Sequence, residues 1–256
     1  MKQIEKLIDT HTHLFDKRYD LDKTAVLERT WHTCQAVICV GTDLESSRQA
    51  IKLSESDERI FASVGIHPHE LNDSPTSLEE LVSNRVVAIG ECGMDFKDST
   101  TKTKENINSQ RQLLEYQINL ANKLNLPVII HARECFEELI PILQDLKPRS
   151  GVVHSWTGTL VQAQQIFNLG MYLSFSGMLT YPANETIRQV AKLAPPNKVI
   201  LETDCPYLPP QQIRGQINEP ANVKMVADKL SQVWNKSLGE IITITTSNAR
   251  KLFSLP

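Results

Sequence analysis

The sequence contains no long hydrophobic run and no excess of basic residues. No apolar stretch approaches the roughly 20 residues that a membrane-spanning helix needs, and residues 1–6 lack the apolar core of a secretory signal. Lys and Arg number 27 against 30 Asp and Glu, a formal net charge of −3. Because non-specific affinity for nucleic acid comes mainly from basic side chains on phosphates, this balance excludes a general polyanion-binding surface. We therefore expect a cytoplasmic protein that does not enter the membrane and contacts nucleic acid only locally.

Cysteine is scarce, and the few cysteines follow no pairing pattern. The five residues are odd in number and contain no Cys-x-x-Cys pair: Cys34, Cys39, Cys92, Cys135 and Cys205. Without a secretion signal, this pattern predicts reduced thiols rather than disulfides. Gly/Ser-rich linkers, internal repeats and low-complexity segments are also missing. The sequence therefore predicts a single domain over residues 1–256.

Short apolar runs alternate with longer helical patterns along the chain. We predict eight strands, at residues 7–9, 36–40, 60–64, 86–89, 128–130, 152–153, 171–175 and 199–201. Most are continuous apolar runs, which is typical of parallel strands covered on both faces. Helices are predicted at residues 110–126, 134–146, 160–169, 184–193, 222–234 and 238–253. Eight β–α units in about 250 residues predict a closed (β/α)8 TIM barrel, with a doubly wound open sheet as the alternative.

Two histidines one residue apart, His11 and His13, directly follow the first predicted strand. Side chains at i and i+2 of a strand point to the same face, so both imidazoles converge on one point. Other metal-type ligands each follow a later apolar run: Glu91, His131, His154 and Asp204. Ligands spread over five strand ends meet only if the sheet closes, which favours the barrel.

Four histidines and two carboxylates suit Zn, Mn, Fe or Ni, and tolerate Mg when carboxylates and waters dominate. Six ligands exceed the three that are usual at one catalytic zinc, so we predict two divalent metal cations that share a bridging group. Glu91 is the natural bridge, because it lies mid-chain and has two oxygens. Such a pair can hold a hydroxide and stabilise in-line displacement at phosphorus.

Further motifs extend this pattern over nearly the whole chain. They are Asp9-Thr10-His11-Thr12-His13-Leu14, Gly65-Ile66-His67-Pro68-His69, Gly90-Glu91-Cys92-Gly93-Met94-Asp95, His131-Ala132-Arg133, Gly151-Val152-Val153-His154-Ser155-Trp156-Thr157-Gly158, Ser174-Phe175-Ser176-Gly177, Glu202-Thr203-Asp204-Cys205-Pro206-Tyr207-Leu208, Arg214-Gly215 and Asn218-Glu219-Pro220. With this ordered series the chain resembles the TatD family of metal-dependent hydrolases, a branch of the amidohydrolase-like barrels. It departs from the family pattern at Ile217 and over residues 209–212.

The resemblance implies a metal-dependent deoxyribonuclease that engages DNA at the barrel mouth. It implies one metal on the residues that match His11, His13, Glu91 and Asp204, and a second on those that match Glu91, His131 and His154. For the mechanism we expect a hydroxide between the metals to attack a phosphodiester phosphorus.

Asp204 is the expected general base for this hydroxide. Glu202, two residues earlier, is expected to support the site or accept a proton. Arg133 is likewise two residues away from a candidate ligand, His131, and is expected to bind phosphate or tune the site.

For several other residues the sequence leaves more than one role open. His67 and His69 form a second i, i+2 pair that binds substrate phosphate or caps a strand end; Pro68 between them indicates a turn. Arg214 lies in the loop after the last strand, a usual phosphate-binding position in such barrels, and is a substrate-binding candidate. Trp156 stacks on a base or packs at the barrel rim, and packing is favoured.

The ligand types do not choose between phosphorus and carbonyl carbon. Hydrolysis of an aminoacyl ester on tRNA, or of a lactone, is therefore the alternative activity. A catalytically idle barrel that serves as a scaffold is a second alternative. The complete ligand set argues against the scaffold, because a protein without catalysis has no physical reason to gather six costly polar groups.

Overall fold

The computed structural model describes residues 6–97 and 102–256. The prediction that the N-terminal segment is not a secretory signal concerns residues 1–6, of which residues 1–5 lie outside the described part. The strands are β1 (Leu7–Thr12), β2 (Cys34–Val40), β3 (Ile60–Val64), β4 (Val86–Asp95), β5 (Val128–Arg133), β6 (Gly151–Val153), β7 (Tyr172–Phe175) and β8 (Val199–Leu201). The α-helices are α1 (Lys23–Thr33), α2 (Leu44–Ser56), α3 (Leu78–Leu81), α4 (Lys104–Leu124), α5 (Phe136–Leu146), α6 (Leu160–Asn168), α7 (Glu185–Leu193), α8 (Val223–Trp234) and α9 (Leu238–Phe253). Short 3-10 helices are η1 (Lys17–Tyr19), η2 (Pro75–Ser77), η4 (Gly177–Thr180), η5 (Pro196–Lys198), η6 (Gln211–Ile213) and η7 (Pro220–Asn222).

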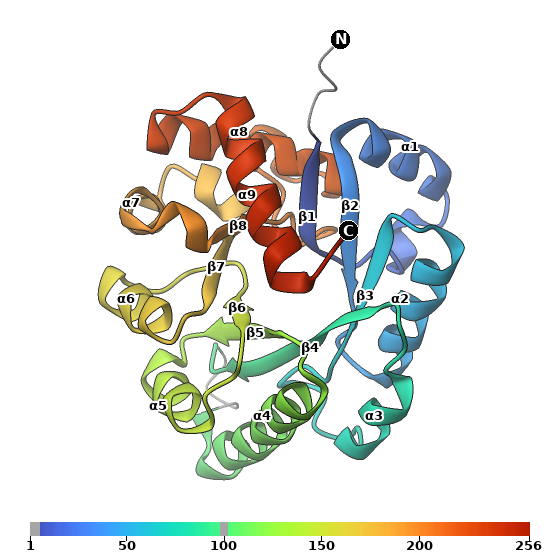
Figure 1. Cartoon of the computed structure of the whole chain (residues 1–256), viewed down its shortest axis with the longest axis vertical. Helices are drawn as coiled ribbons and strands as arrows, with labels where there is room; N and C mark the ends of the chain where they lie inside the picture. The colour runs from blue at the N-terminus through green and yellow to red at the C-terminus, as the bar shows by residue number, and fades with distance from the viewer. Residues whose placement is uncertain (1–5, 98–101) are drawn as a thin grey trace.

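The eight strands form one parallel sheet in the order β1 to β8, each paired with the next along the chain. The last strand returns to the first through a parallel bridge between Thr12 and Cys205. A 2.8 Å hydrogen bond from His13 N–H to Cys205 O extends this closure. The helices surround the strands as an outer ring (Figure 1). The predicted TIM barrel is confirmed, and the sequential strand order excludes the doubly wound sheet.

Two apolar layers account for the closed barrel. One lies between the strands and the surrounding helices and includes Val37, Leu114 and Leu173. The other joins inward-facing strand residues such as Ile38 and Ile200 to α9 and the residues after it. Helix α9 crosses one end of the ring near the C-terminus (Figure 1). This packing closes the amino-terminal end of the barrel, so polar groups gather at the carboxyl end.

Strand β4 runs well beyond its apolar segment and ends at Asp95 rather than at residue 89. Gly93 makes this extension possible next to β5, since its φ is +151° and a Cβ there would lie 2.0 Å from His131 O. The longer strand brings Glu91 and Asp95 beside the end of β5. The structure also adds α1, α2 and α3, whose bounds were not predicted.

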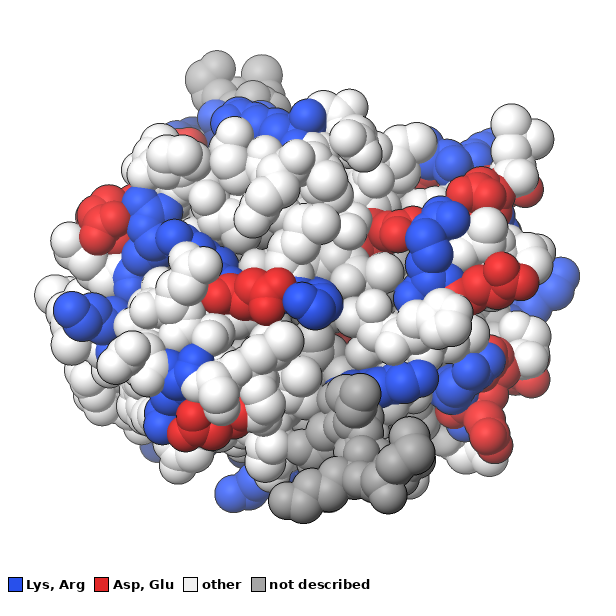
Figure 2. All heavy atoms as spheres, turned by 90° about the horizontal axis from the view of Figure 1, so that it is seen from above, with Lys and Arg blue, Asp and Glu red and all other residues white. Residues whose placement is uncertain are grey.

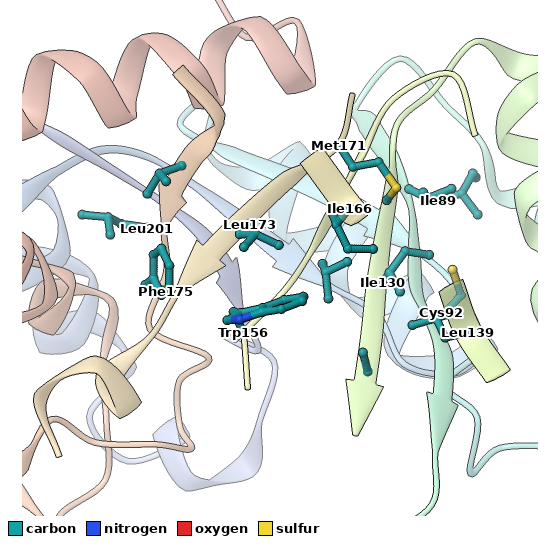
Figure 3. Close-up of a cluster of buried hydrophobic side chains, with 14 of the residues drawn as sticks. Ile89, Cys92, Ile130, Leu139, Trp156, Ile166, Met171, Leu173, Phe175 and Leu201 are labelled. Carbon is teal, nitrogen blue, oxygen red and sulfur yellow. The ribbon is translucent and has the colours of Figure 1, made fainter. Parts of the chain in front are cut away.

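Trp156 lies among buried apolar side chains that include Phe175 and Leu173 (Figure 3). Its ring is 1% exposed and packs 4.9 Å from the ring of Phe136. The prediction that Trp156 packs is therefore confirmed. The five cysteines are all buried and free. Within the described residues, no helix is long and apolar enough to cross a membrane.

Candidate metal centre

His11, His13 and Asp204 form the first group of potential ligands. The two histidines lie at the end of β1, and Oδ1 of Asp204 lies 3.7 Å from His11 Nε2 and 3.3 Å from His13 Nε2. Asp204 reaches this position because its φ is +58°, a left-handed conformation that aspartate tolerates better than most residues. A 2.9 Å hydrogen bond from Asp204 N–H to His11 O holds the turn against β1.

Glu91, His131 and His154 form the second group. Oε1 of Glu91 lies 2.8 Å from His131 Nδ1 and 3.0 Å from His154 Nε2. Its other oxygen, Oε2, lies 3.3 Å from His11 Nε2 in the first group. The two oxygens of one carboxylate therefore face two different groups of potential ligands.

Three of the histidines are oriented by a polar partner on the outer side of the ring. His13 Nδ1 lies 2.8 Å from the carbonyl oxygen of Val40, which can only accept, so this nitrogen carries the hydrogen. In the same way, His154 Nδ1 faces Glu202 Oε1 at 3.3 Å, and His131 Nε2 faces Asp95 Oδ2 at 3.1 Å. The inner nitrogen of each ring thereby faces the cluster, which is the orientation that metal-ligating histidines adopt.

The electrostatics of the cluster also fit a bound cation. The carboxylates of Glu91, Asp95 and Glu202 are buried, and in the described chain their ion pairs are all with histidines, none with Lys or Arg. His11 is fully buried as well, and neither of its ring nitrogens forms a hydrogen bond with any described residue. Buried charges and unpaired polar atoms are costly unless something compensates them, and a divalent cation would do so.

The pKa values show how strongly these groups depend on one another. Burial alone raises the pKa of Glu91, but the charge of His154 and a hydrogen bond from His131 hold it well below its usual range. Burial lowers the pKa of His154, and the two carboxylates Glu91 and Glu202 raise it well above the ordinary value. The carboxylate of Glu91 is therefore ionised, as a cation-binding group must be.

The side chains of Glu202 and Asp204 do not lie together at the pocket, although side chains two residues apart on a regular strand would share one face. Strand β8 ends at Leu201, and the left-handed turn at Asp204 breaks the alternation. Glu202 accepts a hydrogen bond from Ser174 Oγ and holds the outer nitrogen of His154. The structure therefore places Glu202 behind the candidate ligand His154, in a supporting position, rather than at the pocket surface.

Asp95 and Ser174 were missed in the prediction of site residues. Both stand in the quoted motifs, but their contacts depend on which strands are neighbours. Burial alone raises the pKa of Asp95, yet the hydrogen bond from His131 brings it to about 2. The sequence signal that could have identified Asp95 is its carboxylate two residues after Gly93, at the end of the motif that contains Glu91.

His67 and His69 lie after β3, at one side of the same pocket. His67 Nδ1 accepts a 3.2 Å hydrogen bond from His69 N–H, so the hydrogen of the neutral ring is on Nε2. Burial, above all, lowers the pKa of His67 to about 3, which keeps the ring neutral. His67 thus presents an N–H donor to the pocket, 3.8 Å from Glu91 Oε1, rather than a lone pair for a metal.

The two arginine candidates lie in different places. Arg133 ends β5, is exposed, and lines the pocket together with the ligands. Among the described residues it forms no ion pair, so its guanidinium is available to an anion. Arg214 lies over the ring of Tyr181, 5.0 Å from its centroid, and is not among the residues that line the metal pocket. The structure does not bring Arg214 to the cluster.

The cluster lies in an open pocket of about 360 Å³ at the carboxyl ends of the strands. Basic and acidic side chains are interspersed on the face shown in Figure 2. The geometry of the barrel and its histidine–carboxylate clusters defines the class of metal-dependent hydrolases.

Comparison with known proteins identifies the family. A family model described as TatD related DNase matches residues 8–254. The chain belongs to this TatD family. A Bacillus subtilis protein, uncharacterized metal-dependent hydrolase YabD, is 35% identical over 97% of this chain and 99% of its own length. The crystal structure of YjjV, a TatD homolog from Escherichia coli, superposes with a TM-score of 0.91 at 30% identity, over 99% of this chain and 100% of that one.

Proposed function

We propose that this protein binds two divalent cations and hydrolyses phosphodiester bonds of DNA. The first cation would be held by His11, His13 and Asp204, and the second by His131 and His154. The observation that carries this proposal is the position of Glu91, whose Oε2 faces His11 and whose Oε1 faces His131 and His154. A carboxylate between two ligand sets is the usual bridge of a two-metal centre. Zn, Mn and Mg are the candidate ions.

DNA is the proposed substrate because the family model is described as a DNase and the pocket carries anion-binding groups. Arg133 lines the pocket and forms no ion pair with any residue that the structure describes, and His69, which also lines it, is exposed. Such groups contact phosphate locally without a basic surface elsewhere. The bound cations would supply Lewis-acid activation of water and of the phosphoryl oxygens.

The side chains have separate tasks in this proposal. Burial raises the pKa of Asp204, but its hydrogen bond with His13 and the nearby histidine charges lower it, so the carboxylate is ionised and can take a proton from the attacking water. His67 Nε2–H donates to a non-bridging phosphoryl oxygen, and Arg133 binds the same phosphate or its neighbour. Glu202 and Asp95 keep His154 and His131 in the required ring orientation. A cytoplasmic location, also proposed, is consistent with five free thiols.

Metal-free protein loaded with Mg²⁺, Mn²⁺ or Zn²⁺ tests the proposal. Each form is given single-stranded DNA, an aminoacyl ester and a simple lactone, and bound metal is counted by atomic emission. We expect nucleotide release that requires metal and is lost in His11→Ala. Glu91→Gln should reduce both metal content and turnover, whereas Glu185→Gln, on the exposed face of α7, should change neither.

The other outcomes each contradict a part of the proposal. Hydrolysis of the ester or lactone without nucleotide release would show carbonyl chemistry instead. No turnover of any substrate by protein with two bound metals would favour the scaffold. If Asp204→Asn keeps normal turnover with metal bound, the assignment of Asp204 as the base is wrong.

A further inference from the structure

The metal pocket contains two aromatic rings, of Phe15 and Tyr207, which both contact the ring of His13. The centroid of the His13 ring lies 5.7 Å from that of Phe15 and 5.9 Å from that of Tyr207, both in edge-on contact. Both aromatic residues line the pocket that contains the ligands. Tyr207 is 48% exposed. A large aromatic surface open to water beside a reactive centre is available for contact with a flat ligand group.

The ring of Tyr207 is held in place from behind. The guanidinium carbon of Arg18 lies 4.4 Å from its centroid. Asp16 fixes this guanidinium with two hydrogen bonds, of 2.9 Å to Nε and 2.7 Å to Nη2. Arg18 lines a neighbouring groove of about 420 Å³ and not the metal pocket. One face of the ring is thus covered by a cation while the residue still lines the pocket.

The backbone of Tyr207 is fixed as well. Its N–H donates to Asp204 O at 2.9 Å, and its carbonyl accepts from Asn218 Nδ2 at 2.7 Å. The ring is therefore tied to the same turn that places the candidate ligand Asp204. A rigid platform at a set position loses little conformational entropy when a ligand stacks on it.

Another part of the pocket has a different chemistry. Arg133 ends β5, and His67 and His69 follow β3, two strands that pair with neither β1 nor β8. Aromatic rings, a cluster of candidate ligands, and a group of N–H donors that includes the Arg133 cation therefore line one pocket. A nucleotide offers a partner to each of them: a flat base, a reactive phosphodiester and a further phosphate.

We propose that Tyr207, backed by Arg18 and with Phe15 lining the same pocket, is a stacking platform for a nucleobase next to the scissile phosphate. This proposal rests on the proposed function and names the substrate as a base-bearing nucleotide. Stacking is tolerant of sequence because every base has a π-face. The platform therefore recognises a base without selecting which base is present.

Paired substrates test the platform. One is a dinucleotide with thymine on both sugars, and the other has the same backbone with abasic sugars. In metal-loaded Tyr207→Ala and Tyr207→Leu, KM for the thymine substrate should rise roughly tenfold to one-hundredfold, from the usual strength of base–aromatic stacking. KM for the abasic substrate should not change, and kcat should change little for either. Tyr207→Phe and Tyr207→Trp should keep the wild-type preference.

Tyr181→Ala is the matched control, because Tyr181 also carries an arginine on its ring but does not line the metal pocket. It should leave both KM values unchanged. An equal rise in KM for both substrates in Tyr207→Leu would show a structural wall and overturn the platform.

A binding measurement separates this proposal from the proposed cleavage. Calorimetry compares thymidine monophosphate with deoxyribose 5-phosphate on the metal-loaded protein. Tighter binding of the nucleotide that is lost in Tyr207→Leu supports the platform even if no phosphodiester is cleaved. Equal affinity for the two ligands overturns it even if DNA is cleaved.

Discussion

Asp95 Oδ2 accepts a hydrogen bond from His131 Nε2 across 3.1 Å, which leaves Nδ1 of the same ring facing Glu91. The contact joins Asp95, the last residue of β4, to His131, two residues before the end of the neighbouring strand β5. An acidic partner on the outer nitrogen sets the tautomer of a ligating histidine and increases its basicity. In the proposed metal centre, Asp95 therefore acts through His131 and is not itself a ligand.

Asp95→Asn should weaken metal binding at the group that contains His131. The amide can still accept the hydrogen bond but carries no charge, and loss of such outer partners typically costs about 10- to 100-fold in affinity. Competition with a chromophoric chelator measures this change. Asp228→Asn, which alters an exposed carboxylate paired with Lys224, is the control and should bind metal normally. Unchanged affinity in Asp95→Asn would contradict the role of this carboxylate.

Removal of metal should lower the melting temperature. The buried carboxylates and the unpaired nitrogens of His11 lose their compensating charge in the metal-free protein. A ligand present at about 100 times its Kd stabilises the folded state by about 2.7 kcal/mol, and for a chain of this size that corresponds to roughly 5–10 °C. Scanning calorimetry with and without chelator measures the shift. Equal melting temperatures, with metal content verified, would show that the cluster does not depend on a cation.

Thr203→Val should destabilise the closure of the barrel. Thr203 is fully buried, and its hydroxyl donates to Asp9 Oδ2 at 2.6 Å, which connects the loop after β8 to β1. Valine has the same shape but leaves Asp9 without this donor, at a cost of about 1–3 kcal/mol. Urea unfolding measures the free energy. The exposed Thr24→Val is the control, and an equally small effect of both substitutions would contradict the importance of this contact.

The ion pair of Asp57 and Arg59 should make a small pH-dependent contribution to stability. Hydrogen bonds from Arg59 lower the pKa of Asp57 below its ordinary value. A lowered folded-state pKa means that the stabilisation is present above about pH 4. This stabilisation is lost as the pH falls through the pKa that Asp57 has in the folded protein. Since Arg59 is largely exposed, the pair contributes at most about 1 kcal/mol.

The Asp57→Asn variant tests the direction of this pH dependence. The variant should be slightly less stable than the parent protein at pH 7, and the difference should shrink as the pH falls below about 4. Urea denaturation at several pH values measures both. A difference that grows as the pH falls would mean that another group is responsible.

The strands and the histidines that follow them were predictable because both signals are local. A continuous apolar run predicts a buried strand, and a polar group at its end is visible in the same few residues. Metal ligation by these residues stays a prediction. The end of β4 was not predictable in this way, since residues 90–95 contain two glycines and continue as a strand only because β5 lies alongside.

The sequence by itself determined the eight-unit barrel and the residues that gather at the carboxyl ends of its strands. Only the tertiary structure decided how those residues divide into two groups around Glu91, and which partners orient them. Val40 O holds His13, Asp95 holds His131, and Arg18 lies over the ring of Tyr207. The physical reason is that each of these contacts joins different segments of the chain. A backbone carbonyl has no signature in the sequence, and the neighbour of a side chain is known only when the strands and loops have packed.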